Sequence, residues 1–375
     1  MKKIVYVVTE DWYFWSHRLG LAEEAKNKGY EVFVLTREGA YSDKIEKKGF
    51  ILIPISILRG FASPLRELQV IIQLVKQYKT IKPDLIHHIA LKSILLGSIA
   101  ALLARIPIVI NSYMGMGYLF ISNNFKTRFV RAFIVWLMAK ILRTDKYNSI
   151  VQNSHDYKVL SELGLIDSST TTLIQGSGVD TQVFDYSEEV SDNSKIILFA
   201  SRLLADKGIY DFIAAARILR EQDLPVRFII VGDRDEENPT CIKEEEILTW
   251  VDEGIVEWWG YKENMHEVFA QVHIVCLPSY HEGFPKVLLE AASCGRPIIT
   301  TNIPGCRDIV NDGLNGFLIP VKNPIRLAGA MEKLLSSSIV RSKMGLAGRK
   351  RVIDSFNSER INKQTIDLYN SLLEV

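Results

Sequence analysis

The chain has few cysteines, and they do not form a recognisable functional set. Its 375 residues include only Cys241, Cys276, Cys294 and Cys306, all in the second half. None stands in Cys-x-x-Cys spacing or beside a pair of histidines. This pattern argues against a disulfide framework and against a zinc site. We expect four small apolar side chains in a reducing compartment.

The sequence also lacks a long hydrophobic run. The longest uncharged, mainly apolar stretch, residues 94–104, ends at Arg105. About 20 such residues are needed to span a bilayer. The basic N-terminus has the start of a signal peptide, but its apolar run is short and meets Glu10 and Asp11. This pattern favours a first buried strand, and we expect no segment that crosses a membrane.

The chain also lacks an overall excess of charge, since its net charge is only +1. This value conceals two halves of opposite charge. Residues 1–178 hold 23 Lys and Arg against 14 Asp and Glu, a balance of +9. The remainder holds 22 against 30, a balance of −8. Two halves of opposite charge indicate different partners. Nucleic acid is not expected, because the basic half contains no known nucleic-acid-binding module.

The length exceeds what one hydrophobic core usually supports, so two domains are expected. Apolar runs alternate with helical patterns in each half, which predicts parallel sheets covered on both faces. The expected strands are 4–8, 32–36, 51–55, 85–88, 108–111, 150–152, 196–200, 228–231, 256–258, 274–277, 298–300 and 316–319. The expected helices are 18–28, 65–78, 92–103, 126–142, 155–163, 209–220, 265–271, 286–294, 326–335, 340–356 and 361–373.

The fold class predicted from this alternation is α/β, with two doubly wound, Rossmann-like domains facing a cleft. The segment 176–193 has no strong periodicity and is the expected linker. The predicted domains are 1–178 and 179–356. Residues 357–375 are expected to form a C-terminal helix that packs back towards the first domain. In such folds, ligands bind outside the carboxyl ends of the strands.

The most informative motif lies at 280–285, Tyr-His-Glu-Gly-Phe-Pro. It follows an apolar strand, and Pro285 is expected at the first position of the next helix. Gly283 and Phe284 would then form a tight turn with free backbone N–H groups. Glu282 and Glu290 are spaced to accept hydrogen bonds from two parts of one extended, hydroxyl-rich ligand. A nucleotide sugar is such a ligand.

A second motif places two cations in a connection between a strand and a helix. Arg202 and Lys207 follow the predicted strand 196–200. Fixed cations at this place can neutralise a departing diphosphate. The alternative is that both are solvated surface charges. Their occurrence in one domain with Glu282 and Glu290 favours the first reading.

These residues together resemble the donor site of family 4 glycosyltransferases, which are retaining enzymes of the GT-B fold. The resemblance covers essentially the whole chain. It implies that Arg202 and Lys207 hold the nucleotide diphosphate. It also implies that Glu282, in the turn with Gly283, Phe284 and Pro285, contacts the sugar, and that Glu290 binds the ribose diol. Glu282, Arg202 and Lys207 would be the catalytic residues.

A closer resemblance lies in residues 231–241, which are similar to a loop of bacterial transferases that add N-acetylhexosamine to undecaprenyl-diphosphate-linked sugars. It implies a UDP-sugar donor carrying N-acetylgalactosamine or N-acetylglucosamine, and a role in surface polysaccharide or glycan assembly. Three alternatives stay open: a UDP-sugar 2-epimerase of the same fold, a transferase that uses another donor such as a GDP-sugar, and a non-catalytic sugar-nucleotide-binding subunit.

The same loop contains Asp233 and Asp235 in D-x-D spacing, with which another glycosyltransferase architecture holds a divalent metal. A lone D-x-D is a weak motif. The basic pair and helix N-termini can offset the diphosphate charge instead. We therefore expect a polar loop, no metal and no cofactor.

The acceptor is expected on the first domain, at two strand ends. Residues 9–18, expected as a loop, lack the glycine pair of many relatives, which favours side-chain contacts by Ser16, His17 and Arg18. Trp12, Phe14 and Trp15 either pack in the core or form an aromatic wall. The run 113–118 includes Tyr113, Gly115 and Gly117, and its glycines permit close approach to a ligand.

Two further features of the first domain are weighed against structural roles. His87 and His88 end a strand without metal-ligand spacing, so core roles are favoured. The helix expected at 126–142 mixes basic residues with Phe and Trp. It is either a core helix with a solvated basic face or a surface that rests on anionic lipid. With a lipid-linked acceptor, the second reading places the protein on the inner face of the cytoplasmic membrane.

Overall fold

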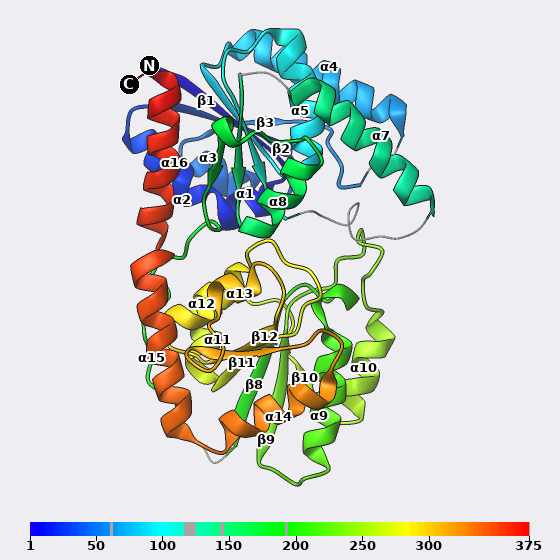
Figure 1. Cartoon of the computed structure of the whole chain (residues 1–375), viewed down its shortest axis with the longest axis vertical. Helices are drawn as coiled ribbons and strands as arrows, with labels where there is room; N and C mark the ends of the chain where they lie inside the picture. Colours follow the sequence, from blue (N-terminus) through cyan, green and yellow to red (C-terminus); the bar gives the residue numbers. More distant parts are fainter. Residues whose placement is uncertain (61–62, 116–124, 143–145, 192–193, 375) are drawn as a thin grey trace. The chain divides into compact units, whose positions relative to one another are not determined.

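The computed structural model describes residues 1–60, 63–115, 125–142, 146–191 and 194–374 (Figure 1). The chain divides into two compact units. Unit 1 is Met1–Ser177 with Arg360–Val375, and unit 2 is Gly178–Glu359. Each unit is an α/β structure built on one parallel sheet, which is the predicted fold class.

Unit 1 contains, in its described part, a sheet of seven strands in the order β3-β2-β1-β4-β5-β6-β7. All of its strand pairs run parallel. The strands are β1 (Lys3–Glu10), β2 (Glu31–Arg37), β3 (Ile51–Pro54), β4 (Leu85–Ile89), β5 (Val109–Tyr113), β6 (Tyr147–Val151) and β7 (Thr171–Leu173). The order reverses between β1 and β4, which is the topological switch point of a Rossmann-like sheet.

Helices cover both faces of this sheet (Figure 1). One core layer packs beneath α4, α5 and α7, and the other beneath α1, α2 and α16. The helices are α1 (Asp11–His17), α2 (Leu19–Asn27), α3 (Ser42–Lys47), α4 (Pro64–Ile81), α5 (Leu91–Ala104), α7 (Phe125–Leu142), α8 (Ser154–Glu162) and α16 (Ser358–Leu373), with a 3-10 turn η1 (Ser168–Thr170).

Unit 2 repeats the plan, with a six-stranded parallel sheet in the order β10-β9-β8-β11-β12-β13 among its described residues. Its strands are β8 (Lys195–Ala200), β9 (Val226–Val231), β10 (Glu257–Trp258), β11 (Ile274–Leu277), β12 (Ile298–Thr301) and β13 (Gly316–Ile319). Its helices are η2 (Ala205–Lys207, 3-10), α9 (Ile209–Arg220), α10 (Glu244–Asp252), α11 (Met265–Gln271), α12 (Lys286–Ser293), α13 (Cys306–Ile309), α14 (Pro324–Leu335) and α15 (Ser338–Ser355). The switch point lies between β8 and β11.

The structure corrects the prediction of a loop at 9–18, because residues Asp11–His17 form helix α1. Bulky aromatic residues disfavour a helix locally, but tertiary packing overrides this weak preference. Phe14 is fully buried and packs edge-on against Tyr6 and Phe50, with ring centroids 5.9 and 6.0 Å apart. Trp12 and Trp15 are only partly buried.

The sequence prediction also missed strand β7, helices α3, α10 and α13, and the two 3-10 turns. Strand β7 has three residues and lies at the sheet edge. Helices α3 and α13 have six and four residues, too few to show a period. Helix α10 begins with three consecutive glutamates, which hid an amphipathic pattern that buries Ile247 and Trp250.

The C-terminal helix α16 packs against the sheet of unit 1. Its Tyr369 is fully buried, and the hydroxyl lies 2.5 Å from His87 Nδ1 and 3.3 Å from the Tyr6 hydroxyl. His87 Nε2 in turn bonds to the Ser112 hydroxyl. Hence His87 joins the terminal helix to the centre of the sheet.

His88 serves the opposite layer of unit 1. Its ring lies 3.0 Å from the Tyr78 hydroxyl and 2.9 Å from Asn111 Oδ1. Burial lowers the pKa of His88 to about 4, so the ring is neutral at neutral pH. Both histidines therefore lie in the core with hydrogen-bond partners, as the sequence favours.

The four cysteines are free thiols, three of them buried. None of the helices in the described ranges combines the length and apolar character that crossing a membrane requires.

The ring of His88 fits only because residue 97 has no side chain. A Cβ at Gly97 of α5 would lie 2.4 Å from two ring atoms of His88. We expect Gly97→Ala to lower the free energy of unfolding by about 1–3 kcal/mol, because overpacking a dense core forces displacement. The measurement is urea denaturation.

Gly329→Ala is the matched control, since Gly329 is also a helical glycine and its Cβ would meet nothing within 4 Å. Alanine there should be neutral or stabilise by up to about 1 kcal/mol. Equal effects of the two substitutions would contradict the packing argument.

Candidate active site

Loops at the carboxyl edge of the unit 2 sheet carry the predicted donor residues. Arg202 and Lys207 follow β8, and Glu282 follows β11. These two strands are neighbours on either side of the switch point. In open α/β sheets, ligands bind at this position.

Backbone contacts hold the two loops against each other. Gly208 has φ +77°, and a Cβ on it would lie 2.0 Å from Pro278 O. The backbone N–H of Tyr280 donates to Asp206 O at 2.9 Å. The loop after β9 joins the same assembly, because the backbone N–H of Leu203 donates to Asp233 O at 3.0 Å. Three strand-end loops therefore form one connected platform.

An ion pair joins the two switch-point loops through their side chains. Lys207 Nζ lies 2.7 Å from Glu282 Oε1, and both side chains are largely buried. The Ser279 hydroxyl donates to the same carboxylate oxygen at 2.7 Å. An ammonium has three donors, so the pair fixes Lys207 and still leaves it able to bind an anion.

Arg202 is held by a different acid. Its Nη1 lies 2.6 Å from Asp235 Oδ2, and the side chain of Arg202 is 43% exposed. Asp235 belongs to the D-x-D sequence, and here it orients the arginine. Within the described ranges, no group of three His, Cys, Asp or Glu side chains is arranged to hold a metal ion.

The turn before α12 differs in one detail from the sequence prediction. Pro285 is the N-cap residue and the helix begins at Lys286, so Pro285 is not its first helical residue. The turn also depends on Gly305, because a Cβ there would lie 2.3 Å from Gly283 O. Phe284 anchors it to the core, with its ring 5.3 Å from that of Phe356.

Glu290 lies on α12, one turn beyond Lys286. Its Oε1 is 3.3 Å from Lys286 Nζ. Burial raises the pKa of Glu290, and the nearby Lys286 ammonium opposes this shift. The four predicted donor residues thus behave differently: Lys207 and Glu282 pair with each other, whereas Arg202 and Glu290 pair with other residues.

Sequence reasoning missed the supporting residues of this platform. Asp206 accepts a hydrogen bond from the Thr240 hydroxyl at 2.7 Å, which ties η2 to the loop after β9. Asp211 of α9 is bonded to the Tyr280 hydroxyl, and burial raises the pKa of both groups, that of Tyr280 to about 12. Among the platform residues that sequence reasoning missed, only Gly208 had a sequence pattern that could have revealed it, a glycine between a basic residue and a predicted helix.

The residues predicted to bind the acceptor lie in unit 1, and two of them are occupied locally. The Ser16 hydroxyl donates to Trp12 O at 2.8 Å and lies 2.7 Å from His17 Nδ1. The His17 ring stacks on Tyr13, with centroids 4.3 Å apart. Both residues lie at the end of α1 and help to close it.

The other three predicted acceptor residues lie near the end of β5. Arg18 is buried, and its Nη2 lies 2.6 Å from Met114 Sδ. Tyr113 is buried with a raised pKa, and its hydroxyl has no hydrogen-bond partner among the described residues. Gly115 has φ +87°. The predicted run continues to Tyr118, but 116–118 fall outside the described residues.

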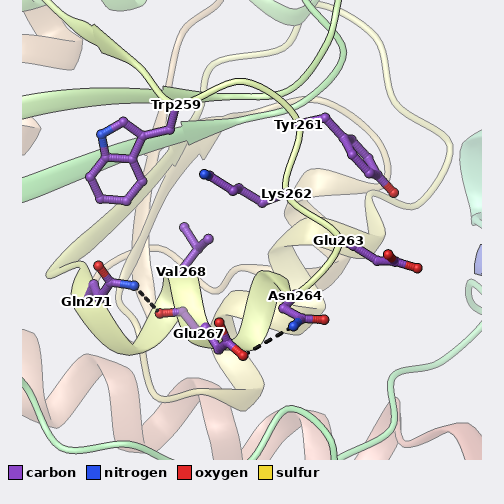
Figure 2. A pocket seen from close by; sticks show the side chains of 8 residues that line it. All are labelled: Trp259, Tyr261, Lys262, Glu263, Asn264, Glu267, Val268 and Gln271. Carbon is purple, nitrogen blue, oxygen red and sulfur yellow. Dashed lines mark hydrogen bonds between the residues drawn. The ribbon is translucent and has the colours of Figure 1, made fainter.

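A cavity of about 550 Å³ lies elsewhere in unit 2. Figure 2 shows its lining side chains, which come from the loop 259–264 and from α11. Asn264 Nδ2 donates to Glu267 Oε1 at 3.2 Å on its floor. Arg202, Lys207, Glu282 and Glu290 are not among the lining residues, so this cavity is not the predicted donor site.

Known protein families match both units. Residues 181–351 match the family described as glycosyl transferases group 1. Residues 3–147 match the family described as glycosyl transferase 4-like. The chain belongs to these glycosyltransferases. The platform at the switch point of unit 2 is therefore part of a glycosyltransferase domain.

Several curated proteins are similar to this glycosyltransferase along most of their length. One is the N,N'-diacetylbacillosaminyl-diphospho-undecaprenol alpha-1,3-N-acetylgalactosaminyltransferase of Campylobacter jejuni, 26% identical over 95% of each chain. Another is the UDP-Gal:alpha-D-GlcNAc-diphosphoundecaprenol alpha-1,3-galactosyltransferase of Escherichia coli, 24% identical over 92% of this chain and 89% of the other.

Solved structures agree on the fold. Anabaena HepE in complex with UDP and glucose has a TM-score of 0.80 at 21% identity, covering 99% of this chain and 100% of HepE. The sucrose-phosphate synthase of Thermosynechococcus elongatus has a TM-score of 0.80 at 20% identity over both whole chains. The glycosyltransferase thus has the GT-B type of fold, with two Rossmann-like domains.

The contact of Gly208 with Pro278 predicts how the platform responds to a single methyl group. Gly208→Ala must move η2 away from β11, and with it Lys207 from Glu282. We expect at least a ~10-fold loss in kcat/KM, because a displacement of about 1 Å can cost up to ~100-fold in rate. Glycosyl transfer and urea denaturation measure the two effects.

Gly313→Ala provides the control. Gly313 has φ +74°, close to that of Gly208, but its Cβ would meet nothing within 4 Å. Alanine there carries only the backbone strain of about 1–2 kcal/mol and should leave turnover unchanged. The platform argument fails if both variants lose activity to the same extent.

Proposed function

We propose that this glycosyltransferase moves an N-acetylhexosamine, N-acetylgalactosamine or N-acetylglucosamine, from a UDP-sugar to an undecaprenyl-diphosphate-linked saccharide, with retention of configuration. The observation that carries the proposal is the Lys207–Glu282 ion pair at the switch point of unit 2. In this proposal, the cation of the pair binds the diphosphate and the adjacent acid accepts hydrogen bonds from the sugar hydroxyls.

The diphosphate is bound by Lys207 and Arg202 in this proposal. Each cation already has one acid partner, and the remaining donors of both are available to phosphate oxygens. The guanidinium of Arg202 has five N–H donors, of which only one hydrogen-bonds a described residue. Ion pairing before the ligand arrives holds the cations in position, so less side-chain entropy is lost on binding.

The two glutamates take the two ends of the donor. Glu282 accepts hydrogen bonds from the sugar hydroxyls, next to the backbone of Gly283, Phe284 and Pro285. Glu290 accepts both hydroxyls of the ribose diol. Because burial raises the pKa of Glu290, the ionised form that a diol prefers depends on Lys286.

The proposed mechanism depends on where negative charge develops during the reaction. As the glycosidic C–O bond loosens, negative charge grows on the departing UDP and is met by Arg202 and Lys207. The acceptor hydroxyl then attacks the same face that UDP leaves and gives its proton to the departing diphosphate oxygen, so a new C–O bond forms with retention. Fixed cations in a preorganised site supply this electrostatic stabilisation. We infer that neither a metal nor a cofactor takes part, so transfer should persist in EDTA.

The proposed substrates rest on the relatives. The Campylobacter protein is named for N-acetylgalactosamine transfer and the Escherichia protein for galactose transfer, both to diphospho-undecaprenol-linked sugars. The product would serve the assembly of a surface polysaccharide or glycan. Three rivals become outcomes of the test: a UDP-sugar 2-epimerase, a GDP-sugar transferase, and a subunit that binds a donor without turnover.

A donor screen separates these functions. UDP- and GDP-sugars are incubated with and without an undecaprenyl-diphosphate disaccharide, and the products are analysed by mass spectrometry and NMR. Acceptor-dependent release of UDP with an α-linked hexosamine product supports the proposal. Conversion of UDP-N-acetylglucosamine without acceptor supports an epimerase. Acceptor-dependent transfer from GDP-sugars alone overturns the UDP assignment, and donor binding without turnover overturns catalysis.

Removing either cation tests the proposed mechanism. We expect Arg202→Ala and Lys207→Ala each to lower kcat by about 100-fold or more, because leaving-group charge is no longer neutralised. Arg227→Ala is the control: Arg227 forms a two-point ion pair with Glu257 and is the second residue of β9, at the amino end of the strand and away from the carboxyl edge that carries the site. Near wild-type turnover of both site variants would refute their role.

We further propose that unit 1 rests on the inner face of the cytoplasmic membrane through α7. Phe133 and Trp136 of this helix are 61% and 57% exposed, with their rings stacked 6.1 Å apart. The helix carries four basic residues and no Asp or Glu, and the sequence from 85 to 144 has no acidic residue at all. Exposed aromatic residues beside basic ones suit an anionic lipid surface.

The double variant Phe133→Ser/Trp136→Ser tests this surface. We expect it to lose most of the binding to phosphatidylglycerol vesicles in a flotation assay, because its apolar area no longer enters the lipid interface. The double variant Ile325→Ser/Ile339→Ser removes two exposed apolar side chains from unit 2 and should bind as wild type. Wild-type protein that does not float with these vesicles would refute membrane contact.

A further inference from the structure

Arg18 of unit 1 is a buried cation that has no acidic partner in the part of the chain that the structure describes. Arg18 is the residue after α1, and it is only 5% exposed. Among the described residues, its one hydrogen bond is from Nη2 to Met114 Sδ, and its Nε is buried without a partner. Burying a charge without a counter-charge is strongly unfavourable, so this arrangement needs an explanation.

Two other arginines of the chain show the kind of pairing that Arg18 lacks. Arg341 is 2% exposed and directs Nε and Nη2 at the two carboxylate oxygens of Glu189. Arg227 directs the same two atoms at Glu257, at 2.7 and 2.8 Å. This edge of a guanidinium matches two oxygens of a carboxylate or phosphate. In Arg18, by contrast, Nη2 meets a single sulfur atom and Nε has no hydrogen-bond partner among the described residues.

A second donor converges on that sulfur. Gln152, which follows β6 and is buried, directs its Nε2 at Met114 Sδ at 3.4 Å. A thioether is a weak acceptor, yet two N–H groups point at it, one from the end of α1 and one from the end of β6. Met114 is itself only partly buried and has three rotatable bonds. The thioether therefore occupies the position that an anionic oxygen would suit far better.

The described groups around Arg18 add no negative charge. The groups whose pKa it influences are Tyr6, His87 and Tyr369, and the hydrogen-bonded His87 is kept neutral by burial and by the guanidinium itself. The nearest acids along the chain have other partners: Glu10 pairs with Arg37 and Arg59, and Asp11 accepts from Tyr41 and Ser42.

We propose that Arg18 and Gln152 form an anion subsite for a phosphoryl group of the acceptor, and that the Met114 side chain fills it when no ligand is bound. This inference rests on the proposed function, because it assigns the site to a prenyl-diphosphate-linked substrate. Met114 rotates outward, and the Nε and Nη2 edge of Arg18 then binds two phosphoryl oxygens while Gln152 donates to one of them.

Binding of farnesyl diphosphate to the full chain tests the subsite, with the donor site saturated by UDP. We expect Arg18→Met to weaken this binding by about 10- to 100-fold, as expected for losing hydrogen bonds to a charged group. Arg18→Lys keeps the charge but lacks the fork, so its loss should be intermediate. The affinity for UDP should stay within about twofold of wild type in both variants.

Thermal unfolding of the ligand-free protein is a second measurement, and it distinguishes a ligand-binding arginine from one with a purely structural role. Arg18→Met removes a buried charge that has no partner, so its Tm should equal or exceed that of wild type. Arg341→Met leaves Glu189 unpaired and should lower the Tm. A Tm loss in Arg18→Met as large as that in Arg341→Met overturns the proposal and indicates a structural role.

The remaining outcomes are also decisive. Equal farnesyl diphosphate affinity in wild type, Arg18→Met and Arg18→Lys overturns the subsite, even if one variant folds poorly. Weakened UDP binding instead overturns its assignment to the acceptor and assigns the anion to the donor. If no sugar is transferred but farnesyl diphosphate binding still depends on Arg18, the subsite stands and the proposed function fails.

Discussion

The contact between the β8 and β11 loops is the constraint on which the candidate site depends. A glycine at 208 lets the backbone of one loop lie against Pro278 of the other, and the Lys207–Glu282 ion pair joins them through side chains. Because the two strands are neighbours at a switch point, both loops project from the same edge of the sheet. A platform built this way places a cation and an acid together without a long, entropically expensive loop.

Each cation of this platform forms an ion pair with an acidic side chain, and these ion pairs explain how the site residues are held. Asp235 orients Arg202, Glu282 orients Lys207, and Lys286 offsets the burial of Glu290. Paired charges are tolerated in partly buried positions where isolated ones are not. Unit 1 departs from this rule at Arg18, whose guanidinium meets a thioether. The departure is the physical reason to assign an anionic ligand there and not at an arginine such as Arg341.

The regular parts of the fold were predictable because burial imposes a period on the sequence. Both sheets consist of strands flanked by helices, so continuous apolar runs alternated with helical patterns, and helices α9 and α11 were predicted to the residue. Local sequence patterns gave the wrong secondary structure where tertiary contacts decide it. Residues 11–17 are rich in aromatics and were predicted as a loop, but burial of Phe14 against Tyr6 and Phe50 makes them a helix.

The sequence by itself determined the fold class, because period is a local property, and it placed Arg202, Lys207 and Glu282 after strand ends and Glu290 in the helix that follows. The family came from the resemblance of these motifs to those of known glycosyltransferases. Only the tertiary structure decided the partners. It paired Lys207 with Glu282 across 75 positions of sequence, gave Arg202 the aspartate of a D-x-D sequence, and left Arg18 buried beside Met114, 96 positions away. Such pairings depend on which strand ends become neighbours, and no local pattern in the chain encodes that.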